Sequence, residues 1–98
     1  MHRAVDPLLR LSAQRALLGA ISPPIRLVKI AQTEREITFS AIAAVPLSEK
    51  EREALSVASA EIISDFPECT IKEILEISDQ PLPREDVLAN GWVYLRAE

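Results

Sequence analysis

Histidine, cysteine and glycine are scarce in this 98-residue chain, and each scarcity excludes a kind of site. The single histidine, His2, and the single cysteine, Cys69, provide neither a paired metal site nor a nucleophile with its activating base. The two glycines, Gly19 and Gly91, are too few and too far apart for a phosphate-binding loop. We therefore expect no catalytic residue, no metal site and no cofactor, and we predict that the protein is not an enzyme.

Long apolar runs are missing as well. No stretch approaches the roughly 20 apolar residues that span a bilayer, and Asp6 precedes any long apolar segment near the N-terminus, which is atypical of a signal peptide. A lone cysteine also excludes an internal disulfide bond. These features predict a cytoplasmic protein that does not contact a membrane.

The composition nevertheless predicts a folded chain. Apolar residues make up 48% of the sequence and no low-complexity tract occurs, so enough apolar surface exists for a core. Chains of this length usually form one domain. We expect residues 1–98 to form a single compact domain in which residues 1–5 are frayed.

The strongest structural signal lies in residues 48–67. Ser48 and Glu51 have the spacing of a helix capping box, and Pro67 is placed to end the helix. Between them the apolar residues recur every three or four positions, which is the period of a helix with one buried face. The residues of this stripe are Leu55, Ala58, Ile62 and Phe66.

The other segments complete an α+β pattern. Asp6 followed by Pro7 begins a first helix that we expect to reach Leu18. Residues 25–32 and 36–44 are rich in β-branched and alternating apolar residues and predict a hairpin. Residues 70–78 fit both a helix and a strand; we favour a strand, because a hairpin alone does not form a stable sheet.

Residues 92–96 predict the last strand, with Trp92, Tyr94 and Arg96 on one face and Val93 and Leu95 on the other. A single helical turn is expected at residues 84–88. The predicted element order is thus α-β-β-α-β-β. The simplest architecture is a four-stranded, mainly antiparallel sheet with two helices packed on one face.

The net charge of −4 is distributed unevenly. The first 30 residues carry five basic and one acidic side chain, whereas the remaining residues carry six basic and fourteen acidic ones. Uneven charge is common on protein surfaces, but an acidic surface disfavours nucleic acid as a partner and favours a basic protein. We therefore predict a basic protein partner and no nucleic acid.

Two groups of side chains are candidates for this contact. One group is acidic and lies at the end of the second helix and in the proline-containing loop expected at residues 79–90, where a solvated surface is the plainer interpretation. The other is aromatic and lies on the last strand, where burial in the core is the plainer interpretation. The candidate partner-binding residues are Glu61, Asp65, Glu68, Glu85, Asp86, Trp92 and Tyr94.

Three stretches of the chain together resemble a known group. They are Ser-Ala-Gln-Arg-Ala-Leu-Leu-Gly at residues 12–19 with Pro23 and Arg26 beyond it, Ile-Ile-Ser-Asp-Phe-Pro at residues 62–67, and Gly-Trp-Val-Tyr-Leu-Arg at residues 91–96. In this order they resemble small bacterial immunity proteins of polymorphic toxins, including those of contact-dependent growth inhibition.

The resemblance implies a cytoplasmic protein that binds one toxin domain, often a nuclease, and blocks its active site or the access of its substrate. The residues alone leave a different class of function open. A small structural or oligomerising domain that pairs through a sheet edge, including pairing as a homo-oligomer, would have the same pattern.

Overall fold

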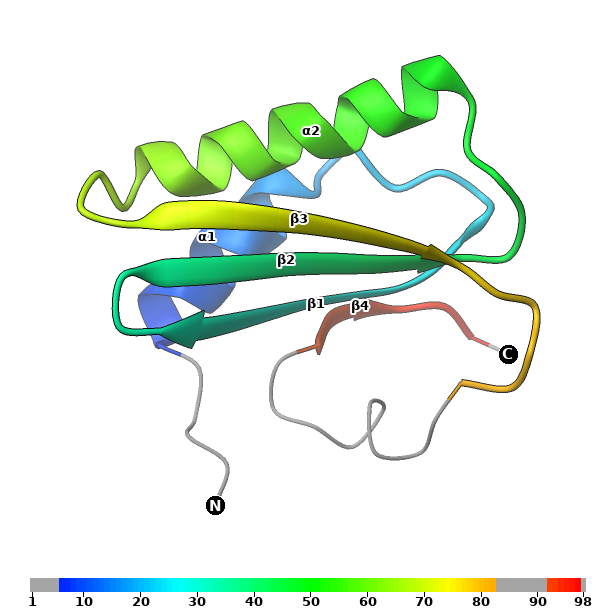
Figure 1. Cartoon of the computed structure of the whole chain (residues 1–98). Coiled ribbons are helices and arrows are strands. Elements are labelled where there is room, and N and C mark those ends of the chain that lie inside the picture. The colour runs from blue at the N-terminus through cyan, green and yellow to red at the C-terminus, as the bar shows by residue number, and fades with distance from the viewer. Residues whose placement is uncertain (1–5, 83–91, 98) are drawn as a thin grey trace.

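The computed structural model describes residues 6–82 and 92–97, which form an α+β fold of two helices and a four-stranded mixed sheet (Figure 1). The predicted α-β-β-α-β-β order is confirmed, whereas the helical turn expected at residues 84–88 falls outside the described residues. The elements are α1 (Pro7–Ala16), β1 (Ile25–Thr33), β2 (Glu36–Ala43), α2 (Glu49–Ser64), β3 (Thr70–Ile77) and β4 (Trp92–Leu95).

The strands lie in the order β3-β2-β1-β4. β1 pairs antiparallel with both β2 and β4, and β2 pairs parallel with β3. The parallel pair follows from the connection, because α2 carries the chain back to the end of the sheet at which β2 began. The sheet is therefore mainly antiparallel, as predicted, with β3 and β4 at its two edges.

The start of α2 is fixed by its first turn. The Ser48 hydroxyl accepts a hydrogen bond from the Glu51 amide at 3.1 Å, and the Ser48 amide donates to Glu51 Oε1 at 2.9 Å. The predicted capping box is therefore present. The hydrogen bond from the Ser48 amide is the main reason that the pKa of Glu51 lies below its ordinary value.

Replacing Ser48 by alanine should lower the free energy of unfolding by about 1 kcal/mol, because the Glu51 amide loses its acceptor at an exposed helix end. Urea denaturation followed by circular dichroism measures this change. Ser64, which is also exposed and lies at the other end of α2, is the matched control position. An unchanged midpoint for Ser48→Ala would mean that the cap does not stabilise the helix.

The helix α1 begins with a side-chain N-cap and ends earlier than expected. Asp6 Oδ1 accepts a hydrogen bond from the Leu8 amide at 2.8 Å, and Pro7 occupies the first turn. The helix ends at Ala16, two residues before the predicted Leu18. The chain then turns through Gly19, whose φ of 79° is a left-handed conformation that glycine adopts without strain.

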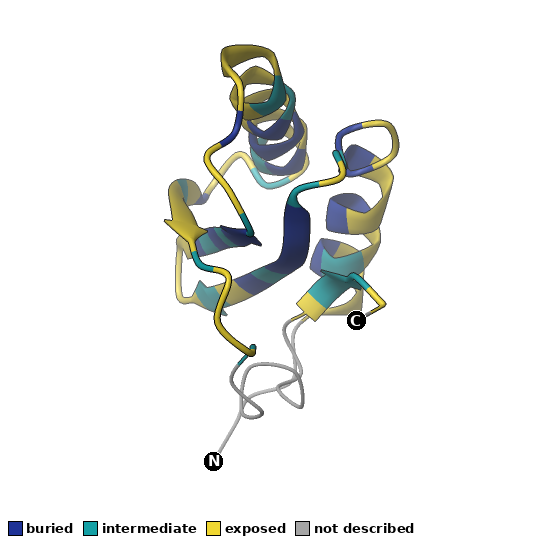
Figure 2. Ribbon diagram, turned by 90° about the vertical axis from the view of Figure 1, so that its right-hand side faces the viewer, coloured by how far each residue is buried: buried dark blue, intermediate teal, exposed yellow. Residues whose placement is uncertain are grey.

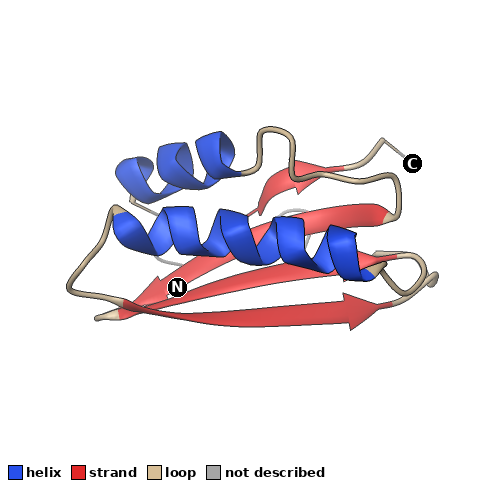
Figure 3. Cartoon of the chain, turned by 90° about the horizontal axis from the view of Figure 1, so that it is seen from above, coloured by secondary structure: helices blue, strands red, loops and turns tan. Residues whose placement is uncertain are grey.

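Both helices cover one face of the sheet, as predicted (Figure 3). In the layer between them, Leu9 and Ala13 of α1 and Ile62 of α2 are fully buried, while Phe66 is only partly buried against the same cluster. Ile62 is therefore the stronger anchor of the second helix. The strand residues of this layer are Ile25, Val28, Ile30, Ile37, Phe39, Ala41 and Ala43.

The central strand β1 is covered on both faces. Leu27 and Val28 are neighbours and point to opposite faces, yet neither has any exposed surface. Burial on both faces explains why two adjacent apolar residues interrupt the alternation of this strand. The register with β2 shifts between Ile25 and Leu27, so that Arg26 lies at a bulge. Arg26 is only 4% exposed, and its Nη1 donates to the carbonyls of Ser78 at 2.8 Å and Gln80 at 2.7 Å.

The faces of the last strand differ from the prediction. Tyr94 lies opposite Val28, on the face that the helices cover, but the register shifts and Trp92 lies opposite Lys29. Because Val28 and Lys29 point to opposite faces, Trp92 and Tyr94 do so as well. The expectation that Trp92 and Tyr94 share a face is wrong, since simple alternation does not include this irregularity.

Candidate partner-binding surface

One end of the molecule gathers acidic side chains from two connections. The turn between β1 and β2 and the connection between α2 and β3 lie side by side at the left of Figure 1. They are joined by a hydrogen bond from the Thr70 amide to the Arg35 carbonyl at 2.7 Å. This contact follows from the parallel pairing of β2 with β3, in which Glu36 lies opposite Thr70.

The carboxylates of Glu34, Glu36 and Glu68 line one open hollow of about 790 Å³ at this end, together with Thr33, Arg35 and Thr70. All three glutamates are exposed. We call Glu34, Glu36 and Glu68 the acidic end. Three glutamates and one arginine around a single hollow give this end a net negative charge.

Of the three predicted helix-end acids, only Glu68 belongs to the acidic end. Asp65 lies at the C-terminus of α2, and its Oδ2 accepts a hydrogen bond from the Ser12 hydroxyl of α1 at 2.6 Å. Glu61 is exposed and lines a different hollow, of about 340 Å³, between α2 and the residues that follow α1. The structure thus distributes Glu61, Asp65 and Glu68 over three surroundings.

The two aromatic candidates have different surroundings as well. Trp92 is 38% exposed, and its carbonyl accepts a hydrogen bond from Arg10 Nη1 at 2.8 Å. Tyr94 is partly buried and packs against the core cluster. The remaining candidates, Glu85 and Asp86, lie outside the described residues.

Sequence reasoning did not include Glu34 and Glu36 among the candidates. Residues 33–35 are only the connection between the two strands of the predicted hairpin. The neighbouring acids Glu34 and Glu36 were a visible signal, but their proximity to Glu68 depends on the parallel pairing of β3, which no local pattern encodes.

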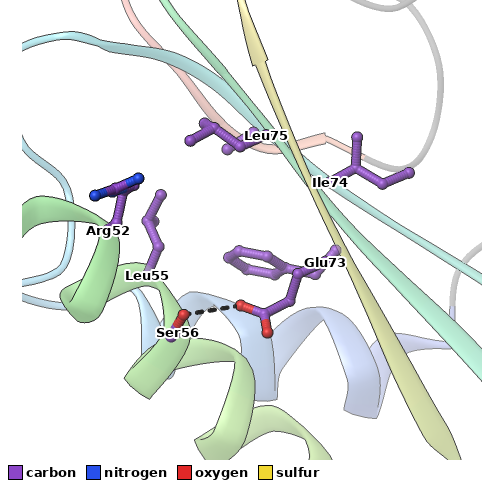
Figure 4. A pocket seen from close by; sticks show the side chains of 8 residues that line it. Arg52, Leu55, Ser56, Glu73, Ile74 and Leu75 are labelled. Atoms are coloured by element: carbon purple, nitrogen blue, oxygen red, sulfur yellow. Dashed lines mark hydrogen bonds between the residues drawn. The ribbon is translucent and has the colours of Figure 1, made fainter. Parts of the chain in front are cut away.

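A second, more apolar hollow of about 190 Å³ lies between α2 and β3 (Figure 4). Leu55 of α2 and Leu75 of β3 line its walls, and Phe39 and Ala41 of β2 also line it. The Ser56 hydroxyl donates to Glu73 Oε1 at 3.2 Å across its rim. Ile74 and Leu75 of β3, which line this hollow, are exposed, and α2 does not lie over the outer edge of β3 (Figure 3).

The described residues contain no group of three or more metal-ligating side chains that could hold an ion. Within residues 6–82 and 92–97, neither helix has the length and apolar character that crossing a membrane requires. Cys69 is buried and unpaired.

The fold and this surface define a small α+β protein with exposed acidic residues gathered at one end. Residues 6–98 match the model of the MafI2 immunity protein family, and the chain belongs to this family. The resemblance to toxin immunity proteins is thereby confirmed. A search of curated proteins gave no match. Membership in this family supports a toxin-neutralising function.

Proposed function

We propose that this protein binds a nuclease-type toxin domain in the cytoplasm and neutralises it without catalysis, by covering its basic surface. Family membership supports the toxin as partner. The observation that carries the choice of toxin is the acidic end, where Glu34, Glu36 and Glu68 line one hollow. A nuclease must attract the phosphates of its substrate with lysine and arginine side chains, and these are the groups that the acidic end attracts.

The conformation of Glu34 adds support. Its φ of 50° lies in the left-handed region, where glycine or asparagine is usual and glutamate is strained. Backbone strain of this kind is often retained where a side chain has a function. In this turn it places a carboxylate at the tip of the hairpin, beside the hollow.

The wider interface includes the other predicted residues to different extents. Glu61 is fully available on α2, and Trp92 offers an exposed aromatic ring. Asp65 and Tyr94 contribute less in this proposal, because Asp65 already accepts a hydrogen bond from Ser12 and Tyr94 packs against the core. Contacts through Glu85 and Asp86 belong to the same proposal.

The test begins with the toxin that co-purifies with tagged immunity protein from the native host, identified by mass spectrometry. Raising the salt concentration from about 50 to about 500 mM should slow association markedly, because the Debye length falls from about 14 to about 4 Å. Glu36→Lys with Glu68→Lys should reduce the association rate at low salt by about tenfold or more. Stopped-flow fluorescence measures both effects.

The matched control is Glu49→Lys with Glu53→Lys, which makes the same change in net charge on the exposed start of α2. This variant should associate nearly as fast as the wild type. Equal rates for both double variants would contradict a role for the acidic end. A loss of binding on reversal of Glu61, Glu85 and Asp86 alone would instead place the interface along α2 and the residues between β3 and β4.

A further inference from the structure

The strand β3 is an unusually open edge. It pairs with β2 on one side only, and the sheet order places it at the outside (Figure 3). Seven of its eight residues are exposed and one is partly buried, so the strand is yellow along most of its length in Figure 2. The exposed residues of β3 include apolar ones, since Ile74 is 41%, Leu75 40% and Ile77 44% exposed.

Of the features that prevent pairing with another strand, this edge has charged side chains, at Lys72, Glu73 and Glu76, but neither a proline nor a bulge. β3 contains no proline, and its register with β2 is continuous from Thr70 to Ile77 without a bulge. The apolar hollow beside Leu75 also remains open (Figure 4). An edge of eight residues without a bulge, with exposed isoleucine and leucine, is a surface on which another strand can add by hydrogen bonding.

The sequence of β3 indicates which strand would pair with its free edge. Partner residues across a sheet point to the same face, so Lys72, Ile74 and Glu76 lie on the face that the helices leave open, together with Thr38, Ser40 and Ile42 of β2. We propose that a second copy of this chain pairs antiparallel with β3 around a twofold axis at Ile74. Lys72 then lies opposite the partner's Glu76, and Glu76 opposite the partner's Lys72.

This register is the one that places Lys72 opposite a residue of opposite charge. A twofold axis perpendicular to the sheet passes midway between the two copies of one residue, so this central residue determines every pair. Centring on Glu73 or Leu75 would place Lys72 opposite isoleucine or serine, and centring on Lys72 would oppose two lysines. Of the registers that place Lys72 opposite a residue of β3, only the one centred on Ile74 pairs Lys72 with an acid, and it uses every residue from Ile71 to Ile77.

The face toward the helices is compatible with the same register. Ile71 lies opposite the partner's Ile77, which buries apolar surface on both sides of the axis. Glu73 of each copy lies opposite Leu75 of the other. Leu75 and Arg52 line the same hollow, so the arriving carboxylate meets a guanidinium at that point.

The pairing leaves the acidic end open. Glu68 precedes the start of β3, and the two strands run in opposite directions, so the two acidic ends lie at opposite ends of the joined sheet. Dimer formation and toxin binding therefore use different surfaces. The inference does not depend on the proposed function, and either can fail alone.

Sedimentation velocity of the purified full chain, at protein concentrations up to about 1 mM, tests the dimer. The wild type should form a dimer. Lys72→Glu places two pairs of acids across the axis and should raise the dimer dissociation constant about tenfold or more, and Glu76→Lys should do the same. The double variant Lys72→Glu with Glu76→Lys restores opposite charges and should recover dimerisation.

The matched control is Glu53→Lys, which makes the charge change of Glu76→Lys on the exposed surface of α2. It should leave the dissociation constant unchanged. A wild type that stays monomeric at every concentration would overturn the proposal, as would a dimer that Lys72→Glu does not weaken. Failure of the double variant to recover, with native circular dichroism, would also contradict this register.

Cross-linking tests the register without changing a charge. In a Cys69→Ser background, Ile74→Cys should form a covalent dimer under mild oxidation, because residue 74 faces its own counterpart at about 5 Å between Cβ atoms. Ile77→Cys should not, because its counterpart lies at the far end of the paired strand. Equal cross-linking at residues 74 and 77 would contradict the register centred on Ile74.

Discussion

Replacing Ile62 by alanine should lower the free energy of unfolding by about 3–4 kcal/mol. Ile62 has no exposed surface and packs in the layer where α2 meets α1 and the sheet. Alanine would remove three carbon atoms from a site held on several sides, so the cavity could not close completely. Urea denaturation at equilibrium measures the loss, and the midpoint should fall with little change in slope.

Val57 provides the matched control on the same helix. Its side chain is 52% exposed, and Val57→Ala should change the stability by less than about 1 kcal/mol. Phe66→Ala should fall between the two, because the ring is only partly buried. Similar losses for Ile62→Ala and Val57→Ala would mean that α2 does not present its Ile62 face to the core.

Replacing Arg26 by alanine should cost about 3 kcal/mol of stability. The guanidinium is buried at the β1 bulge and donates to the carbonyls of Ser78 and Gln80, which follow β3. The Arg26 carbonyl also accepts the amide of Arg96 at 2.9 Å. The side chain thus joins β1 to the segment after β3, and alanine would leave two carbonyls without this donor.

Arg26→Lys separates the contribution of the positive charge to stability from that of the planar guanidinium group. Lysine keeps the positive charge but cannot present the same planar donor group to two carbonyls, so the loss should be intermediate. Hydrogen exchange should show faster opening of the Ser78 and Gln80 amides in both variants. Unchanged exchange and stability in Arg26→Ala would mean that these hydrogen bonds do not hold the segment in place.

The local pattern of the sequence predicted the elements well, for reasons visible in particular residues. The Ser48–Glu51 capping box lies within four residues, and so does each step of the stripe from Leu55 to Ile62, so neighbours along the chain determine α2. The alternation in residues 36–43 likewise depends on the two-residue period of one strand. The helical and extended segments could therefore be predicted without the tertiary structure.

The candidate surface was less predictable. Glu68 was a candidate because it follows a recognisable helix, whereas Glu34 and Glu36 were not candidates, because their proximity to Glu68 arises from a pairing between distant strands. Asp65 was a candidate by its charge, yet its contact with Ser12 joins residues 53 positions apart. The faces of Trp92 and Tyr94 were wrong because a single shift of register reverses alternation.

The sequence by itself determined the element order, the helix caps, the buried stripe of α2 and the resemblance to immunity proteins, because each depends on residues that are close along the chain. Only the tertiary structure decided the strand order, the bulge that buries Arg26, the acidic end and the open edge of β3. These features arise where segments far apart in the chain meet. Packing and hydrogen bonding between such segments stabilise these features. No local window of the sequence contains both of the segments that meet.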